Sequence, residues 1–160
     1  MPFKNFSIWR GRLPHWRADD VTYFVTFSHR RSLTEGERSI LTRLLIRPDG
    51  SRWDLLILCV LPERTCLIFR VLATSNVAPY ELSKIVEKAK TKAEKLILKK
   101  TGEKYSPFYN ESYDRILRNE EELEVRWQEI FDSPVNLELA ESPEDYEGLW
   151  VAGSPNESSI

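Results

Sequence analysis

An apolar segment in the middle of the chain limits the possible folds more than any other feature. Residues 55–61 form a run of seven nearly uninterrupted apolar residues within the longer segment 53–61. A strand with this pattern is buried on both faces of a sheet, so it belongs near the sheet's centre. Turn residues at 62–64 and a second strand pattern at 65–72 follow directly. The sequence therefore predicts a central hairpin on which the other elements pack.

Strand and helix patterns alternate on either side of this hairpin. Two capping boxes mark helix starts, Thr34 with Glu37 and Asn119 with Glu122. The longest helix is followed by Gly102, which is suited to a C-terminal cap. In chain order, we expect a strand at 21–27, a helix at 34–46, the hairpin at 53–72, a helix at 79–100, a short strand at 108–117, a helix from 119 to about 134, and at most a turn of helix from 142.

This order of elements predicts an α+β fold. Strand, helix, strand, strand, helix, strand is the ferredoxin-like split βαβ arrangement (β-α-β-β-α-β) with an antiparallel sheet, and here a C-terminal helix follows it. Right-handed crossovers place the first two helices on one face of the sheet. The opposite face is then left for the last helix or for a ligand.

The size and composition of the chain fit one globular domain. It has 160 residues, of which 41% are hydrophobic and 30% charged. We expect a basic N-terminal arm at 1–20, a folded domain at 21–150 and a flexible tail at 151–160. No segment approaches the length of about 20 apolar residues that a membrane-spanning helix needs.

The cysteines and histidines do not form a recognisable metal site. Cys59 and Cys66 are too few for a disulfide-stapled secreted scaffold and fit small buried residues better than zinc ligands. His15 and His29 stand in no pattern typical of metal ligands. We therefore expect a cytoplasmic protein with reduced thiols and no membrane association.

The net charge of −2 hides a strong asymmetry. Residues 1–118 carry 22 Lys and Arg against 13 Asp and Glu, whereas residues 119–160 carry one Arg against 12 acidic residues. A basic body at +9 with an acidic C-terminal part at −11 indicates a polyanionic partner for the body. The acidic part would shield that surface or keep the protein in solution.

Two groups of cations are candidate DNA contacts. Five lysines recur at helical spacing and form one stripe, which could follow a phosphate backbone or be a solvated helix face: Lys84, Lys88, Lys92, Lys95 and Lys99. In the N-terminal arm, Arg10, Arg12 and Trp16 either stack on unpaired bases or pack across the sheet. Arg30, Arg31, Arg115 and Arg118 complete the candidates. We expect the lysine stripe and Arg12 to border one continuous positive surface.

Several motifs, taken in order, resemble the REP-associated tyrosine transposases, which are single-tyrosine HUH-type transposases that act on single-stranded DNA. The resemblance spans about residues 10–150. It rests on Arg-Leu-Pro-His-Trp at 12–16, Thr-Tyr-Phe-Val-Thr-Phe at 22–27, Leu-Pro-Glu-Arg-Thr-Cys-Leu-Ile at 61–68, the lysine helix at 82–102, Asn-Glu-Ser-Tyr-Asp-Arg-Ile-Leu-Arg-Asn-Glu-Glu at 110–121 and Ser-Pro-Glu-Asp-Tyr at 142–146. It implies a ferredoxin-like domain that cuts and joins single-stranded DNA, commonly next to hairpins.

The residues that perform the family's chemistry do not carry over. Family members hold Mg²⁺ or Mn²⁺ with two histidines and attack the phosphate with a tyrosine of the last helix. The corresponding positions here are Arg64, Cys66 and Glu129, and no tyrosine occurs between Tyr113 and Tyr146. Arginine cannot ligate a metal. The resemblance therefore implies a degenerate member without catalytic residues or a metal cofactor, which binds single-stranded or hairpin DNA. The sequence does not determine the oligomeric state, for which we favour a monomer.

Further hypotheses remain open. Arg64 would hold a phosphate in place of the lost metal, would form an ion pair with Glu129 inside the old active site, or would be a drifted residue of an exposed hairpin turn. An active transposase could instead use a displaced nucleophile, Tyr109 or Tyr113. The protein could also be an interaction module whose contact surface is the acidic part at 119–160.

Overall fold

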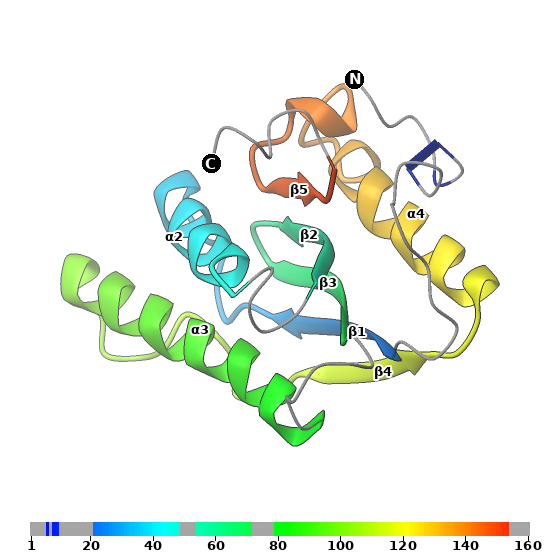
Figure 1. Ribbon diagram of the computed structural model, residues 1–160. Helices are drawn as coiled ribbons and strands as arrows, with labels where there is room; N and C mark the ends of the chain where they lie inside the picture. The colour runs from blue at the N-terminus through cyan, green and yellow to red at the C-terminus, as the bar shows by residue number, and fades with distance from the viewer. Residues whose placement is uncertain (1–5, 7, 10–20, 49–53, 72–78, 154–160) are drawn as a thin grey trace.

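The computed structural model describes residues 6, 8–9, 21–48, 54–71 and 79–153, and everything below concerns these residues. Three long helices and a five-stranded sheet make up most of this part of the chain (Figure 1). The elements are β1 (Val21–Ser28), α2 (Glu35–Ile46), β2 (Asp54–Val60), β3 (Arg64–Val71), α3 (Pro79–Thr101), β4 (Tyr113–Leu117), α4 (Glu120–Asn136), the 3₁₀ turn η1 (Pro143–Asp145) and β5 (Leu149–Val151).

The sheet has the strand order β4-β1-β3-β2-β5, and every pair of neighbouring strands is antiparallel. The first four strands have the order and connections of the ferredoxin-like fold, which confirms the α+β fold expected from the sequence. The apolar strand β2 lies inside the sheet between β3 and β5, because both of its edges are paired. The C-terminal strand β5 is an addition that the sequence patterns did not predict.

The helix starts follow the capping patterns in the sequence. Thr34 Oγ1 accepts from the Glu37 amide at 3.3 Å and the Glu37 carboxylate accepts from the Thr34 amide at 2.9 Å, so the first capping box is complete. At α4, Asn119 Oδ1 accepts from the Glu122 amide at 2.9 Å, while Glu122 itself accepts from the Arg118 amide at 2.7 Å. The second capping box therefore differs from the expected one in one bond. The Glu122 carboxylate accepts from the amide of Arg118 and not from that of the N-cap residue, Asn119.

The last helix continues past the proline expected to end it. Pro134 has no amide hydrogen, so the carbonyl of Ile130 loses its usual helical donor. Ser133 Oγ donates to that carbonyl at 2.7 Å. Because this bond replaces the missing one and Pro134 is buried, α4 runs on to Asn136.

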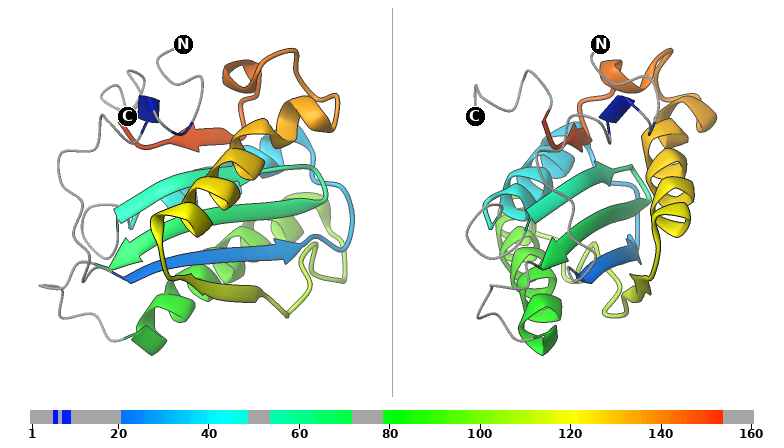
Figure 2. Two further views of the ribbon diagram at one scale, coloured as in Figure 1. Left: turned by 90° about the vertical axis from the view of Figure 1, so that its right-hand side faces the viewer. Right: turned by 45° about the vertical axis from the view of Figure 1, so that its right-hand side comes forward.

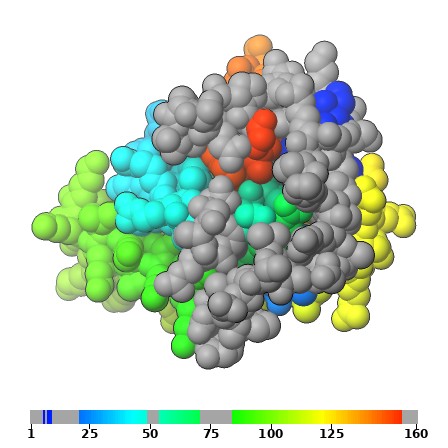
Figure 3. Space-filling model, viewed as in Figure 1, coloured from blue at the N-terminus to red at the C-terminus, as the bar shows by residue number. Residues whose placement is uncertain are grey.

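The helices cover the two faces of the sheet as the crossover argument predicts. Residues of α2 and α3 such as Leu41, Leu45 and Ala93 share one apolar core with Val25 and Leu67 of the sheet. On the opposite face, α4 forms a second core against the remaining sheet residues. Figure 2 shows the sheet between these two layers, and Figure 3 shows α2 and α3 on one side of the molecule with α4 on the other.

The second core also includes residues from the two ends of the described chain. Phe6 and Trp9, from the expected N-terminal arm, are buried against α4, and the Trp9 ring stacks on Trp127 with centroids 5.1 Å apart. Trp9 Nε1 donates to the Ala152 carbonyl at 3.1 Å. The domain boundary expected after residue 150 falls inside β5, whose last residue, Val151, is buried. No helix in the described ranges is long and apolar enough to cross a membrane.

Candidate nucleic-acid interface

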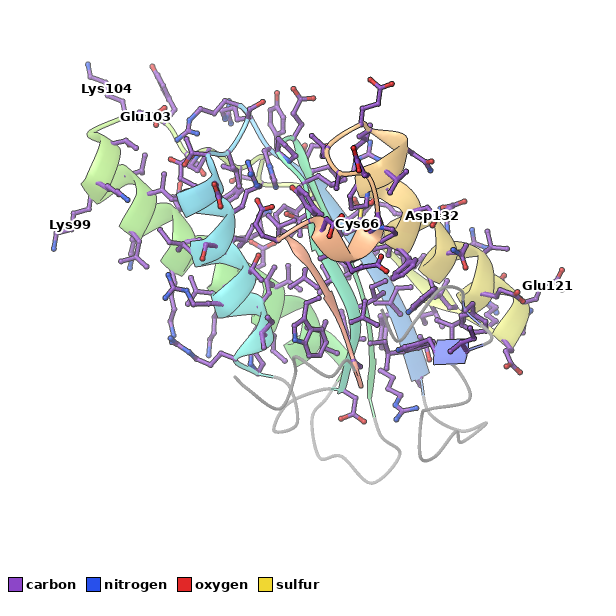
Figure 4. The ribbon with its side chains drawn as sticks, turned by 90° about the horizontal axis from the view of Figure 1, so that it is seen from above. Cys66, Lys99, Glu103, Lys104, Glu121 and Asp132 are labelled. Atoms are coloured by element: carbon purple, nitrogen blue, oxygen red, sulfur yellow. The ribbon has the colours of Figure 1, made fainter. Side chains whose placement is uncertain are left out.

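A cleft of about 850 Å³ opens where the β2–β3 turn meets the second half of α4. Its walls come from the end of β1, the turn residues 61–64 and the α4 side chains between Arg126 and Asn136. Arg64, Cys66 and Glu129 all line it. The three positions that the resemblance assigns to metal ligands and nucleophile, which are distant in sequence, therefore lie around one cleft. Figure 4 shows Cys66 near the α4 layer, in which Asp132 is labelled.

Arg64 is an exposed cation of this cleft. It is the first residue of β3, opposite Ser28 of β1, and its side chain is exposed. None of the ion pairs found among the described residues involves Arg64. A guanidinium that lines a cleft without a carboxylate partner keeps its donors available for an anion, such as a phosphate.

A buried histidine, whose role sequence reasoning missed, holds the turn that presents Arg64. His29 Nδ1 lies 2.8 Å from the Pro62 carbonyl, which can only accept, so Nδ1 carries the proton and donates. Nε2 then accepts from Thr65 Oγ1 at 2.8 Å. Burial lowers the pKa of His29 to about 4, so the ring is neutral at physiological pH. The His29 amide also donates to the Glu63 carbonyl at 2.8 Å.

The two thiols beneath the cleft are protonated at neutral pH. Burial raises the pKa of Cys66 and raises that of Cys59 to about 12. They lie opposite each other on the paired strands β2 and β3, as the sequence predicted, and both are free. Cys66 Sγ is 3.4 Å from Thr26 Oγ1, which gives the thiol a neutral hydrogen-bond partner.

Glu129 does not pair with Arg64, so that hypothesis is wrong. Its carboxylate lies 3.4 Å from Arg126 of the same helix, and its side chain is 60% exposed. Residues three apart on a helix are neighbours whatever the rest of the fold does, whereas Arg64 belongs to another element. The Arg126 guanidinium also lies 4.9 Å from the centre of the Phe24 ring, on the floor of the cleft.

The side chains of the cleft do not fit the divalent metal that members of the REP-associated transposase family hold. Among the described residues, no three His, Cys, Asp or Glu side chains come together as a metal site requires. In the cleft, both nitrogens of His29 are already hydrogen-bonded and Cys66 keeps its proton. Arg64 would add a positive charge where the metal would sit.

The two neighbouring arginines that follow β1 have different surroundings. Arg31 donates to both oxygens of Glu37 and both oxygens of Glu103 at 2.6–3.0 Å, and to the Ser32 carbonyl at 2.9 Å. All of its donor groups are used inside the protein. Arg30 is exposed, has no carboxylate partner among the described residues, and lies 4.9 Å over the Tyr109 ring. Only Arg30 of this pair remains a candidate for DNA contact.

The lysine stripe lies on the other side of the molecule from the cleft. All five lysines are exposed on α3, which packs on the sheet face opposite α4. In Figure 4, Lys99 on α3 and Asp132 on α4 lie at opposite sides, with Cys66 between them. The stripe and the cleft are therefore two separate surfaces. Arg10, Arg12 and Trp16 lie outside the described residues, and so does the expected junction of the stripe with Arg12.

Two predicted DNA contacts lie on and after the edge strand β4. Arg115 is exposed but its guanidinium is 3.2 Å from the Glu122 carboxylate. Arg118 is exposed, and its amide donates to the same carboxylate. Both border a shallow hollow near Tyr23, apart from the main cleft.

A second hollow, of about 550 Å³, adjoins the cleft at Ser28 and Arg64, which line both. Tyr109 and Tyr113 line it as well, with 41% and 53% of their surface exposed. Tyr113 lies opposite Thr26, and Thr26 lies opposite Cys66, so these residues share the α4 face of the sheet. Sequence patterns did not predict this hollow, because its lining comes from three separate segments.

The fold is similar to that of two solved proteins described as transposases. A REP-associated tyrosine transposase bound to a REP hairpin superposes with a TM-score of 0.60 at 16% identity, over 86% of this chain and 82% of that chain. A candidate transposase from Deinococcus radiodurans R1 gives a TM-score of 0.50 at 10% identity, over 72% of this chain and 91% of that chain. No protein-family model and no curated protein matches the sequence. The resemblance inferred from the motifs is thus confirmed at the level of the fold.

Proposed function

We propose that the protein is a degenerate member of the REP-associated tyrosine transposases, which binds single-stranded or hairpin DNA and does not cut it. One observation carries this proposal. Arg64 is exposed in the cleft, without a carboxylate partner among the described residues, beside the other two positions at which the family keeps its catalytic groups. A permanent cation in that place binds a phosphate but offers it neither a nucleophile nor a Lewis acid.

The chemistry of the cleft supports binding rather than cleavage. Arg64 can donate two parallel hydrogen bonds to one phosphate, and the turn that carries it is fixed through His29. Arg30 supplies a second cation on the same wall. The charge of Glu129 is offset by Arg126, so it repels a phosphate less than a lone carboxylate would.

The partner follows from the same argument. The REP-associated tyrosine transposase of similar fold is bound to a REP hairpin, and a hairpin with an unpaired extension is the DNA that we propose for this protein. We further propose that it acts as a monomer in the cytoplasm, with reduced thiols and without a cofactor. Its affinity then falls steeply with salt, because bound phosphates release counterions.

Fluorescence anisotropy with a DNA hairpin carrying a single-stranded extension tests the proposal. We expect Arg64→Gln to lower the affinity about 10-fold, since a charged hydrogen-bond pair contributes about 1.5–3 kcal/mol. The matched control is Arg43→Gln, which removes an exposed arginine of α2 on the opposite layer and should change the affinity less than about 2-fold. Equal effects of the two variants would exclude the cleft as the binding site.

A cleavage assay on the same DNA, with Mg²⁺ or Mn²⁺, separates the rival hypotheses. We expect intact DNA and no covalent adduct. An adduct that disappears in Tyr113→Phe or Tyr109→Phe would establish an active transposase with a displaced nucleophile instead. Absence of any salt-sensitive DNA binding would favour the hypothesis in which the acidic part at 119–160 is a contact surface for another protein.

A further inference from the structure

The hollow beside Arg64 has the composition of a site for unpaired bases. Two partly exposed tyrosine rings, Tyr109 and Tyr113, line it together with Thr26, Ser112, the buried Phe27 and one acidic residue, Glu111. Arg64 and Ser28 belong both to this hollow and to the cleft, so a chain that leaves the cleft over Arg64 enters the hollow directly. A row of cations with adjacent aromatic rings is how proteins grip single strands.

The main chain at Tyr109 is held in place by two hydrogen bonds. Its amide donates to the Ser28 carbonyl at 3.4 Å, and its carbonyl accepts from Lys90 Nζ at 2.9 Å. Lys90 is only 5% exposed, and its ammonium group lies 4.7 Å over the Phe27 ring. Burial lowers the pKa of Lys90, which shows that keeping a cation there is unfavourable by itself. A buried lysine thus fixes the segment that carries Tyr109.

The ring of Tyr113 has a defined position for a different reason. Tyr113 is the first residue of β4 and is paired with Thr26 in the sheet. Its ring meets the edge of Phe24 with centroids 6.3 Å apart, and Phe24 is buried under Arg126. The exposed ring therefore stands on a rigid base, which limits the entropy lost when a base stacks on it.

We infer that this hollow is a base-stacking subsite for single-stranded DNA, in which Tyr109 and Tyr113 receive unpaired bases while Arg64 holds the phosphate between the hollow and the cleft. The inference rests on the proposed function and deepens it. The volume of the hollow lies within the range of about 300–1,000 Å³ that is usual for ligand pockets. Bases inside a duplex keep their faces stacked on one another, so the subsite favours an unpaired extension over the paired stem.

Substitution of the two rings tests the subsite. The probes are a thymidine-rich single strand, a blunt duplex, and a hairpin whose extension contains 2-aminopurine, a base whose fluorescence falls when it stacks. We expect Tyr113→Leu and Tyr109→Leu each to lower the single-strand affinity about 5- to 20-fold and to relieve the quenching, because stacking on an aromatic ring contributes about 1–3 kcal/mol per base. Duplex affinity should change less than about 2-fold.

Two controls make the result specific. Tyr105→Leu removes a tyrosine that is 76% exposed and does not line the hollow, and it should leave both affinities unchanged. Tyr113→Phe keeps the ring and removes only the hydroxyl, so it should restore the single-strand affinity that Tyr113→Leu loses. If the hydroxyl were what mattered, for a structural reason, Tyr113→Phe would not restore that affinity. Thermal unfolding of each variant shows that the fold is retained.

The possible failures are distinguishable. If the leucine variants behave like Tyr105→Leu while Arg64→Gln still weakens binding, the subsite is refuted and the proposed function stands. If Arg64→Gln also has no effect, the proposed function is refuted with it. Equal losses on duplex and single strand would mean that the tyrosines act through the phosphate path and not through base stacking, which also overturns the inference.

Discussion

The two faces of the sheet use their cations in opposite ways. On the α2–α3 side, Arg31 is bound by Glu37 and Glu103, Arg38 by Glu147, and Lys90 by main-chain carbonyls. Among the cations that line the cleft, Arg64 and Arg30 are exposed without carboxylate partners among the described residues. Arg126 is paired with Glu129, and Arg31, which reaches the rim of the cleft, is paired as described. The paired group stabilises the fold, whereas Arg64 and Arg30 are available to a ligand. A charge count treats both groups alike, so pairing and concavity are what locate a candidate interface.

The lysine stripe stands between these two cases. Its residues are exposed like Arg64, yet they lie along the outer side of a helix and not in a hollow. Such lysines attract DNA through the general field of the protein, but they do not fix a particular phosphate. The following predictions compare the two surfaces directly, beginning with the largest effect.

Charge reversal should separate the cleft from the stripe. We expect Arg64→Glu to lower the affinity for hairpin DNA about 100-fold, because it removes a charged hydrogen bond and adds a carboxylate beside the phosphate. Lys95→Glu makes the same change of charge on the stripe and should cost about 3-fold. Both are measured by anisotropy over a range of salt concentrations. A larger loss for Lys95→Glu would move the interface to α3 and reverse the comparison.

Replacement of a paired carboxylate should affect stability and leave DNA binding intact. The Glu37 side chain is 6% exposed and joins Arg31 to the first turn of α2. We expect Glu37→Gln to lower the free energy of unfolding by about 2 kcal/mol, from the lost ion pair and a weakened cap, with DNA affinity unchanged. Urea denaturation gives the first quantity and anisotropy the second. A loss of affinity at unchanged stability would show that the α2–α3 side also reaches the ligand.

The pH dependence of the same pair has a definite sign. Hydrogen bonds from Arg31 lower the pKa of Glu37 from 4.5 to about 2 in the folded protein. A carboxyl group whose pKa is lowered by folding stabilises the protein fully above its unfolded pKa. The contribution of Glu37 should therefore be complete above pH 4.5 and disappear as the pH falls toward 2. The Glu37→Gln variant should lack this part of the acid dependence.

Periodicity and capping predicted the elements whose signals are local. The capping box at Thr34, the apolar run of β2 and the spacing of α3 all describe interactions within about ten residues, and each element forms as expected. β5 was missed because three residues are too few for an alternating pattern. It exists because the main chain at Val60 pairs with Gly148 and Tyr146 Oη donates to the Val60 carbonyl, contacts that no local pattern contains.

The candidate site depended on a different kind of information. The motif resemblance pointed to Arg64, Cys66 and Glu129 together, and the structure places all three around one cleft. What the resemblance did not contain is the pairing of each charge. Arg31 could not be separated from Arg30, because its partner Glu103 lies far away in the sequence. Helical spacing leaves Lys90 out of the lysine stripe, but its bond to the Tyr109 carbonyl could not be predicted.

The buried His29 holds the turn that carries Arg64, and its protonation should change the stability of the protein but not its DNA affinity. Burial lowers its pKa from 6.5 to about 4, so the unfolded chain binds a proton between these values that the folded protein does not. The free energy of unfolding should fall by about 3 kcal/mol as the pH drops through this window, and His29→Gln should remove that slope. DNA affinity should stay constant between about pH 5.5 and 7.5, since the cleft gains no cation there. A histidine signal titrating near 6.5 in NMR spectra and assigned to His29 would contradict this.

The smallest expected effect comes from Glu129. Because its carboxylate pairs with Arg126 and not with Arg64, its removal does not release Arg64. Glu129→Gln instead leaves Arg126 unpaired on the wall of the cleft and removes one negative charge, which should tighten DNA binding about 2- to 4-fold at low salt. Glu124→Gln is the matched control, because it removes the same charge from an exposed position of α4 that does not line the cleft.

The ratio between these two variants is the informative quantity. Both change the net charge equally, so any general electrostatic gain is common to them and disappears at high salt. A gain specific to Glu129→Gln, which is lost again when Arg126 is also replaced by Gln, would place the DNA phosphate within reach of Arg126. Identical gains from both variants would mean that the phosphate does not approach this wall. Its path would then run over Arg64 toward Tyr113 and away from α4.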